Sequence, residues 1–182
     1  MPALEGRIVV ILAADGSEQI EVTAPRDALR NAGADVRVLS PDGSDVRGYH
    51  YIEPGDVIAV DGSIEDAGEV DALVLPGGLG GPDTLRKLEG AVGLVRRVAD
   101  QDKPIGVICH GPWLLVDADV LTGRELTCVP QLARDVTNAG ARYVDQDVHV
   151  DSTPSLLVSS RDHDTAQVFA DALVEHLGAV WS

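Results

Sequence analysis

Four short segments of the chain are rich in aliphatic residues and have the length of buried strands. They are residues 7–13, 35–39, 70–75 and 104–108. Most of them lack the alternation of a half-exposed sheet, and glycine, proline or aspartate follows close behind each run. This pattern predicts strands of a parallel sheet that is covered on both sides.

Helical periodicity occupies the segments between these runs, with apolar residues recurring three or four positions apart. It predicts helices over residues 18–32, 82–99, 111–120, 131–139 and 164–177. In the first of these helices, Ser17 is the expected N-cap and Gly33 follows the last turn. Pro25 lies inside the helix and is expected to kink or split it.

Residues 147–150 and 156–159 flank a polar turn and predict a hairpin. Strands that alternate with helices indicate an α/β protein, here a three-layer sandwich with a mainly parallel central sheet, in one domain over residues 1–182. In such sheets ligands bind beyond the carboxyl ends of the strands. Four loops are expected to face one another there: residues 14–21, 40–45, 76–83 and 109–112.

The amino-acid composition limits the classes of molecule that the protein is expected to bind. Hydrophobic residues make up 45% of the chain but aromatic residues only 3%, so the core must be aliphatic. Fourteen basic against thirty acidic residues give a net charge of −16, which repels phosphate and argues against nucleic acid. No apolar run approaches the roughly 18 to 20 residues of a membrane span, and Arg7 interrupts any signal-peptide core. We therefore expect a cytoplasmic protein without a membrane partner. The acidity fits either a salty cytoplasm or a GC-rich genome.

Cys109 ends the strand at residues 104–108 and begins a turn toward a helix. Gly111 leaves the turn uncrowded, and Pro112 suits a first helical turn. A residue at such a corner projects into the cleft, as the serine of a nucleophile elbow does. The positive end of the helix dipole is expected to lower the pKa of the thiol and make it nucleophilic. The second cysteine, Cys128, is expected to be a small core residue.

Neighbouring residues supply the other parts of a nucleophilic site. His110 can swing beside the sulfur and act as base if a carboxylate orients its other nitrogen. Asp83, in the glycine-rich loop, is a candidate for that carboxylate, although it would also suit a helix N-terminus. The backbone N–H groups of Gly78 and His110 could form an oxyanion hole.

Metal and cofactor chemistry finds no support in the sequence. Two cysteines cannot build a four-cysteine zinc site, and neither a Cys-x-x-Cys motif nor a histidine pair at helical spacing occurs. The first strand is followed by neither a P-loop nor a Gly-x-Gly-x-x-Gly fingerprint. We expect no cofactor and no metal.

The motifs together resemble the ThiJ/PfpI family, and the resemblance runs from Arg7 to Leu177. It is carried by Leu-Pro-Gly-Gly at residues 75–78, Ile-Cys-His-Gly-Pro at 108–112, Gly-Ser-Glu-Gln-Ile-Glu at 16–21 and Ser-Ser-Arg at 159–161. The Cys-His-Gly-Pro form is similar to the PfpI branch of intracellular cysteine peptidases. The resemblance implies a flavodoxin-like fold of the class I glutamine amidotransferase-like superfamily.

The resemblance also implies roles for individual residues. Cys109 matches the nucleophile and His110 its base, while Asp83 matches an acid that completes a triad across a subunit interface. The protein is therefore expected to form a homo-oligomer, a dimer and possibly a hexamer. Glu21 matches a carboxyl that hydrogen-bonds the sulfur, and Glu18 a second acid of the same pocket. Because a carboxylate would repel a thiolate, Glu21 is expected to be protonated. Both glutamates could instead be ordinary first-turn helix acids.

The expected function is that of a cysteine hydrolase or lyase whose thiolate attacks a carbonyl. The resemblance implies three activities: a peptidase, a glyoxalase acting on methylglyoxal, and a deglycase acting on glycated groups. Val129 stands where the PfpI branch commonly has a tyrosine, which puts a peptide substrate in doubt. The alternative is a redox-sensing or chaperone-like stress protein in which Cys109 is oxidised to a sulfinate.

Two further histidines lie beside acidic residues. His149 and Asp151 imitate the His-x-Glu pair of a glutaminase, but their segment is typical of a strand. His163 precedes the last helix within a run of acids, where it is expected to belong to a capping loop.

Overall fold

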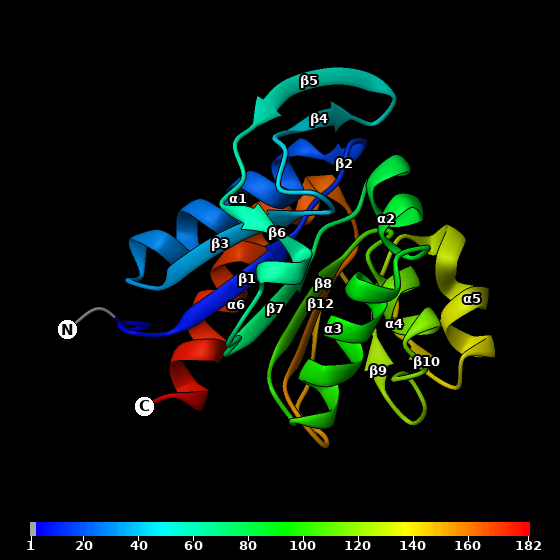
Figure 1. Cartoon of the computed structure of the whole chain (residues 1–182). Helices are drawn as coiled ribbons and strands as arrows, with labels where there is room; N and C mark the ends of the chain where they lie inside the picture. Colours follow the sequence, from blue (N-terminus) through cyan, green and yellow to red (C-terminus); the bar gives the residue numbers. More distant parts are fainter. Residues whose placement is uncertain (1–2) are drawn as a thin grey trace.

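The computed structural model describes residues 3–182 and is organised around a seven-stranded sheet (Figure 1). Its strands are β1 (Ile8–Leu12), β3 (Asp35–Ser40), β6 (Gly62–Ser63), β7 (Ala72–Leu75), β8 (Ile105–Ile108), β11 (Val148–Asp151) and β12 (Leu157–Ser160). They lie in the order β11-β12-β8-β7-β1-β3-β6, and only β11 is antiparallel to its neighbour. The mainly parallel sheet and the hairpin predicted from the sequence are confirmed.

Helices cover both faces of this sheet, so that the molecule has three layers. They are α1 (Gln19–Asn31), α2 (Gly80–Leu85), α3 (Glu89–Asp100), α4 (Pro112–Asp117), α5 (Ala133–Asn138) and α6 (Ala166–Val180). Short 3-10 turns occupy Ile64–Asp66, Pro130–Leu132 and His163–Thr165. In Figure 1, α1 and α6 lie together behind the sheet, and α3 and α4 lie in front of it. Phe169 of α6, the only phenylalanine, is fully buried in an otherwise aliphatic core.

Two predictions about helices are wrong in detail. The helix expected over residues 82–99 is divided, because Leu88 adopts an extended backbone between α2 and α3. Ser17 is not the N-cap of α1, since its hydroxyl accepts a hydrogen bond from the Ala14 N–H and its backbone belongs to the short strand β2 (Ser17–Glu18). Pro25 lies inside a continuous α1, where it is buried and removes one helix hydrogen bond without ending the helix.

A small second sheet lies above the carboxyl ends of β1 and β7 and was not predicted. Strands β4 (Val46–His50) and β5 (Glu53–Ile58) form an antiparallel hairpin, and β4 pairs with β2. Five of the six residues of β5 are exposed or only half-buried, so no hydrophobic alternation marked it. Strands β9 (Glu125–Leu126) and β10 (Arg142–Tyr143), two residues each, were also missed.

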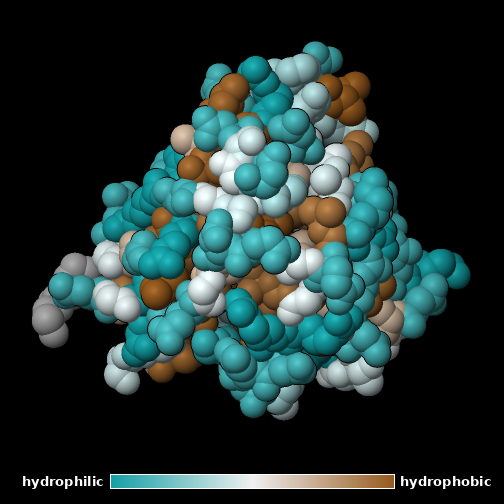
Figure 2. Space-filling model, viewed as in Figure 1, coloured by the Kyte–Doolittle hydropathy of each residue, from teal (hydrophilic) through white to brown (hydrophobic). Residues whose placement is uncertain are grey.

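The β4–β5 hairpin carries a cluster of exposed apolar side chains. Tyr51 and Ile52 at its turn are 66% and 62% exposed, and Val57 on β5 is 54% exposed. Figure 2 shows hydrophobic residues over this projection at the top of a face that is otherwise largely hydrophilic. The hairpin therefore brings apolar surface to the edge of the sheet where the predicted site loops end.

No helix in the described part of the chain combines the length and the apolar character that crossing a bilayer requires.

Candidate active site

The turn after β8 holds Cys109 in a strained, left-handed backbone conformation with φ of 61°. Its N–H donates to the Ser160 carbonyl at 3.1 Å, and its carbonyl accepts from the Val129 N–H at 3.3 Å. These two backbone hydrogen bonds, one to the end of β12 and one to the segment at Val129, fix the position of the turn. A Cβ added at Gly111 would lie 2.3 Å from the Leu75 carbonyl oxygen. Only glycine therefore lets this turn pack against the end of β7.

His110 lies beside the thiol, as predicted. Its Nδ1 is 3.2 Å from Cys109 Sγ. Burial lowers the pKa of His110, so the imidazole is neutral at physiological pH. In the tautomer with its proton on Nε2, Nδ1 is free to accept the thiol hydrogen. The pair therefore has the geometry of a nucleophile and its base.

Glu21 lies in the first turn of α1 and is completely buried beneath the thiol. Its Oε2 accepts a 2.7 Å hydrogen bond from the Gly77 N–H, whereas its Oε1 is buried without a hydrogen-bond partner. Burial raises the pKa of Glu21 from 4.5 to about 8, and the Glu18 carboxylate adds to the rise. The expectation of a protonated Glu21 agrees with this environment.

Gly77 makes this arrangement possible. A Cβ at this position would lie 2.5 Å from Cys109 Cβ, 2.6 Å from Glu21 Oε2 and 2.8 Å from the His110 nitrogen. Atoms of three different segments thus converge on a space that only a hydrogen atom can occupy. The Leu-Pro-Gly-Gly motif is a packing requirement of the site as well as a turn.

The predicted lowering of the thiol pKa is wrong for the protein as it stands. Burial raises the pKa of Cys109, and an ionised Glu21 would raise it further, although the N–H groups of Gly78 and His110 act in the opposite direction. Cys109 is only 7% exposed, and α4, with six residues, is too short to supply a strong dipole. The resting thiol is therefore neutral. Ionisation requires transfer of its proton to His110.

A cavity of about 200 Å³ opens over the thiol. Its lining residues are Glu18, Tyr51, Gly78, Leu79, Cys109, His110, Val129, Gln131, Asp162 and His163. Glu18 is 95% buried, and its Oε2 accepts a 2.8 Å hydrogen bond from the Tyr51 N–H, which ties the β4–β5 turn to the cavity. The lining residue from the hairpin had no signal in the sequence, because only the fold brings it here. His163 lies in the capping turn expected for it and also lines the cavity. Loop 40–45, expected at the site, contributes none of these residues.

Asp83 does not contact His110 within this chain. It lies in the first turn of α2, and its Oδ2 pairs with Lys87 Nζ at 3.1 Å, with both side chains mostly exposed. An acid donated to the site of a second copy would have to be exposed in this way. Donation across an interface stays a prediction.

We expect Asp83→Ala to lower turnover only if the protein is an oligomer. Loss of a carboxylate that orients His110 from a neighbouring subunit would reduce kcat by about tenfold or more, with little change in stability because the Lys87 pair is exposed. Light scattering at low and high salt, run beside the assay, checks the prediction. A monomer with full activity in the Asp83→Ala variant would remove Asp83 from the site.

Two other parts of the molecule do not join this cavity. His149 lies on β11, where Nε2 is 3.5 Å from Glu125 and Nδ1 is 3.3 Å from Gln146, so the structure gives no support to a glutaminase triad.

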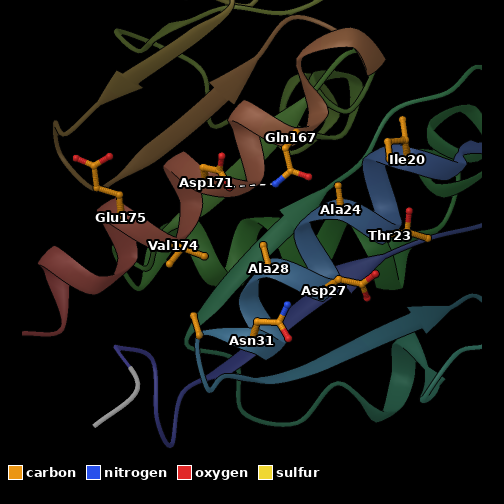
Figure 3. Close-up of a pocket in the computed structure, with 11 residues that line it drawn as sticks. Ile20, Thr23, Ala24, Asp27, Ala28, Asn31, Gln167, Asp171, Val174 and Glu175 are labelled. Atoms are coloured by element: carbon orange, nitrogen blue, oxygen red, sulfur yellow. Dashed lines mark hydrogen bonds between the residues drawn. The ribbon is translucent and has the colours of Figure 1, made fainter.

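A larger hollow of about 750 Å³ lies between α1 and α6 (Figure 3). Neither cysteine lines this hollow. Gln167 and Asp171, which do line it, are joined by a hydrogen bond of 3.0 Å. Among residues 3–182, no three His, Cys, Asp or Glu side chains are grouped as metal ligands.

Comparison with known proteins gives a consistent result. The sequence model of the DJ-1/PfpI family matches residues 7–176. Protein/nucleic acid deglycase 2 of Escherichia coli is 39% identical over 94% of this chain and 98% of its own length. A deglycase of Thermococcus kodakarensis is 39% identical over 84% of this chain and 89% of its own.

Solved structures show the same architecture. Drosophila melanogaster DJ-1beta superposes with a TM-score of 0.85 at 30% identity, covering 94% of this chain and 90% of that one. The chain also spans 48% of a two-domain protein from Anabaena variabilis that contains DJ-1/ThiJ/PfpI-like and ferritin-like domains, with a TM-score of 0.86 and 31% identity.

Proposed function

This chain belongs to the DJ-1/PfpI family, and from that premise we propose that it is a cofactor-free cysteine enzyme of the deglycase or glyoxalase type. Its substrates would be small uncharged carbonyl compounds such as methylglyoxal, or the adducts that they form with proteins. The observation that carries the proposal is the buried contact of 3.2 Å between Cys109 Sγ and His110 Nδ1 at the floor of a small cavity. The two relatives named deglycases support the same choice.

The proposed reaction begins with proton transfer from the Cys109 thiol to His110 Nδ1 as the substrate enters. The sulfur then adds to the aldehyde carbon, and the new oxyanion faces the N–H groups of Gly78 and His110. His110 returns its proton to this oxygen and gives a hemithioacetal. Transfer of the former aldehyde hydrogen, as a proton, to the neighbouring carbon and of the hydroxyl proton to the former ketone oxygen, through an enediol, yields a lactoyl thioester. Water then releases lactate and the free thiol, so the reaction needs no external oxidant.

Glu21 would support the thiolate during this reaction. Cys109 and Glu21 share a buried space, and one negative charge on the pair can rest on either group. While Glu21 holds its proton, its unpartnered Oε1 can donate a hydrogen bond to the sulfur. Protonated Glu21 thus offsets part of the burial that disfavours the thiolate.

The charges around the cavity favour a neutral substrate over an anionic one. Glu18 and Asp162 line it, and no lysine or arginine does. The nearest arginine in sequence, Arg161, is paired with Asp145 and Asp147 instead. An anion entering the cavity would meet two carboxylates without a compensating cation.

A substrate panel tests the proposal. We expect the wild-type protein to consume methylglyoxal with a kcat/KM at least about tenfold above that for 4,5-dioxovalerate, which has the same 2-oxoaldehyde group and also carries a carboxylate. His110→Ala should lower the methylglyoxal rate by about 100-fold or more, because general base catalysis is lost. Chromatography of the 2-hydroxy acid formed from each substrate, lactate in the case of methylglyoxal, provides the measurement.

The matched control for this panel is His149→Ala, which removes a histidine outside the cavity and should leave the rate unchanged. Equal loss in both histidine variants would contradict the assigned base. Hydrolysis of an unfolded protein substrate, with no action on carbonyl compounds, would replace the proposal with a peptidase.

Redox sensing is the second candidate, and the buried, unpartnered Glu21 Oε1 favours it. Together with the N–H groups of Gly78 and His110, a protonated Glu21 would bind the oxygens of a Cys109 sulfinate. Peroxide treatment followed by mass spectrometry of the intact protein tests this candidate. It would gain over the enzyme if Cys109 gained two oxygens while no carbonyl compound was turned over.

A further inference from the structure

Trp113 packs its indole ring against the imidazole of His110. The two ring centroids are 5.1 Å apart, and the ring planes are inclined by 58°. Trp113 lies in the first turn of α4, and its N–H donates to the His110 carbonyl at 3.2 Å. The two residues therefore form one local unit that follows the nucleophile.

Trp113 is itself fixed from two further directions. Its indole N–H donates to Asp135 Oδ2 of α5 at 3.0 Å. The guanidinium carbon of Arg86 lies 5.0 Å from the centre of its ring, a cation–π distance. Arg86, just after α2, and Asp135 of α5 thus hold the indole in place, although Trp113 is only partly buried.

The Arg86 guanidinium is immobilised in turn. Its Nε and Nη2 donate to the two oxygens of Asp117 at 2.7 and 2.9 Å, a bidentate pair. Asp117 is the last residue of α4, so the same short helix carries both the tryptophan and the carboxylate that orients the cation over it. The arrangement resists rotation of the indole.

His110 lacks the usual orienting carboxylate. In cysteine and serine triads a carboxylate fixes the ring of the base. Within residues 3–182, the one polar side-chain contact of the His110 ring is with Cys109 Sγ, and the predicted acid, Asp83, pairs with Lys87. The packing of the imidazole against Trp113 is a further restraint on the ring.

We propose that Trp113 is a positioning residue that holds the His110 imidazole beside Cys109 Sγ. Within this chain it would orient the base, as the carboxylate does in a catalytic triad. Arg86 and Asp135 act through it by fixing the indole. The proposal deepens the proposed function, because it concerns the base of the same pair.

Alkylation of Cys109 by iodoacetamide tests the proposal without reference to any substrate. The protein is used at full length, and the rate is measured from pH 6 to 10 by mass spectrometry of the Cys109 peptide. Trp113→Leu, which keeps apolar volume but removes the ring, is expected to slow alkylation near pH 7 by about tenfold and to shift the pH profile upward, as His110→Ala does. Trp113→Phe, which keeps a ring against His110, should stay within about threefold of the wild type.

A double variant separates positioning from general packing. In the His110→Ala background, Trp113→Leu should cause no further loss, because its effect passes through the imidazole. An equal loss in both backgrounds, or a Trp113→Leu profile that matches the wild type, would overturn the proposal. Thermal unfolding of each variant identifies a misfolded protein, in which case Asp135→Asn and Arg86→Gln provide the milder loosening of the indole.

The same experiment keeps the two proposals distinct. If the wild-type protein turned over no carbonyl compound, the proposed function would fail, yet the coupling between Trp113 and His110 in thiol alkylation would still be measurable. If turnover was present but alkylation showed no coupling, only the role of Trp113 would be lost.

Discussion

Cys109→Ser is expected to reduce kcat/KM for methylglyoxal by at least about 1000-fold, which is the largest effect of any single substitution in this protein. A serine hydroxyl has nearly the same size, so the turn after β8 and its hydrogen bonds to Ser160 and Val129 should persist. Its proton is far harder to remove, and the neutral His110 at 3.2 Å cannot make it an efficient nucleophile. The change therefore removes the chemistry and leaves the cavity.

Cys128→Ser is the matched control. Cys128 is completely buried, burial raises the pKa of its thiol to about 12, and unlike Cys109 it does not line the cavity that a substrate would enter. It should keep full activity if it folds, apart from the modest loss of stability that a buried hydroxyl causes. Residual turnover by Cys109→Ser within tenfold of the wild type would show that another group performs the reaction.

Glu21→Gln is expected to stabilise the folded protein at alkaline pH. Because burial raises the pKa of Glu21 from 4.5 to about 8, the folded chain holds a proton between these values that the unfolded chain has released. The stability of the wild type must then fall as pH rises through this window, by up to about 5 kcal/mol for a shift of this size. Glutamine has no charge to bury, so its variant escapes this pH-dependent loss.

Urea unfolding from pH 5 to 9 measures the difference. The free energies of unfolding of the two proteins should diverge as pH rises, with Glu21→Gln the more stable at pH 9. Turnover should change as well: the wild-type rate should decline above about pH 8, where Glu21 ionises beside the sulfur, and the variant should lack this decline. Glu175→Gln, at an exposed position of α6, makes the same change of charge on the surface. Parallel stability curves for wild type and Glu21→Gln would exclude a buried, protonated Glu21.

The fold was largely predictable because its strands are apolar enough to stand out. Continuous aliphatic runs such as β1 and β8 can be buried only in a covered parallel sheet, and their order along the chain fixed the class of architecture. The β4–β5 hairpin was missed for the opposite reason. It is an exposed ribbon, and its pairing with β2 depends on the position of α1 rather than on its own pattern.

The candidate site divides in the same way. Cys109, His110 and the glycine loop could be found from sequence, since a strand, a thiol and Gly-Pro in succession specify a corner whose side chain points outward. The pKa of the thiol could not be predicted in this way. The helix dipole suggested a lowered pKa for the thiol, whereas Cys109 is buried and burial raises that pKa. The expectation that Glu21, 88 positions earlier, lies beside Cys109 came from the family resemblance and not from a local pattern.

The sequence by itself therefore determined the layered architecture and the adjacent thiol and imidazole of Cys109 and His110, because these follow from local patterns within a few residues of one another. Tertiary structure alone decided how deeply Cys109 and Glu21 are buried, that Tyr51 and Asp162 line the cavity, and that Trp113 rather than Asp83 contacts His110 within one chain. The physical reason is that burial and charge depend on groups brought together from distant segments. Protonation and substrate charge follow from that enclosure, which no local pattern encodes.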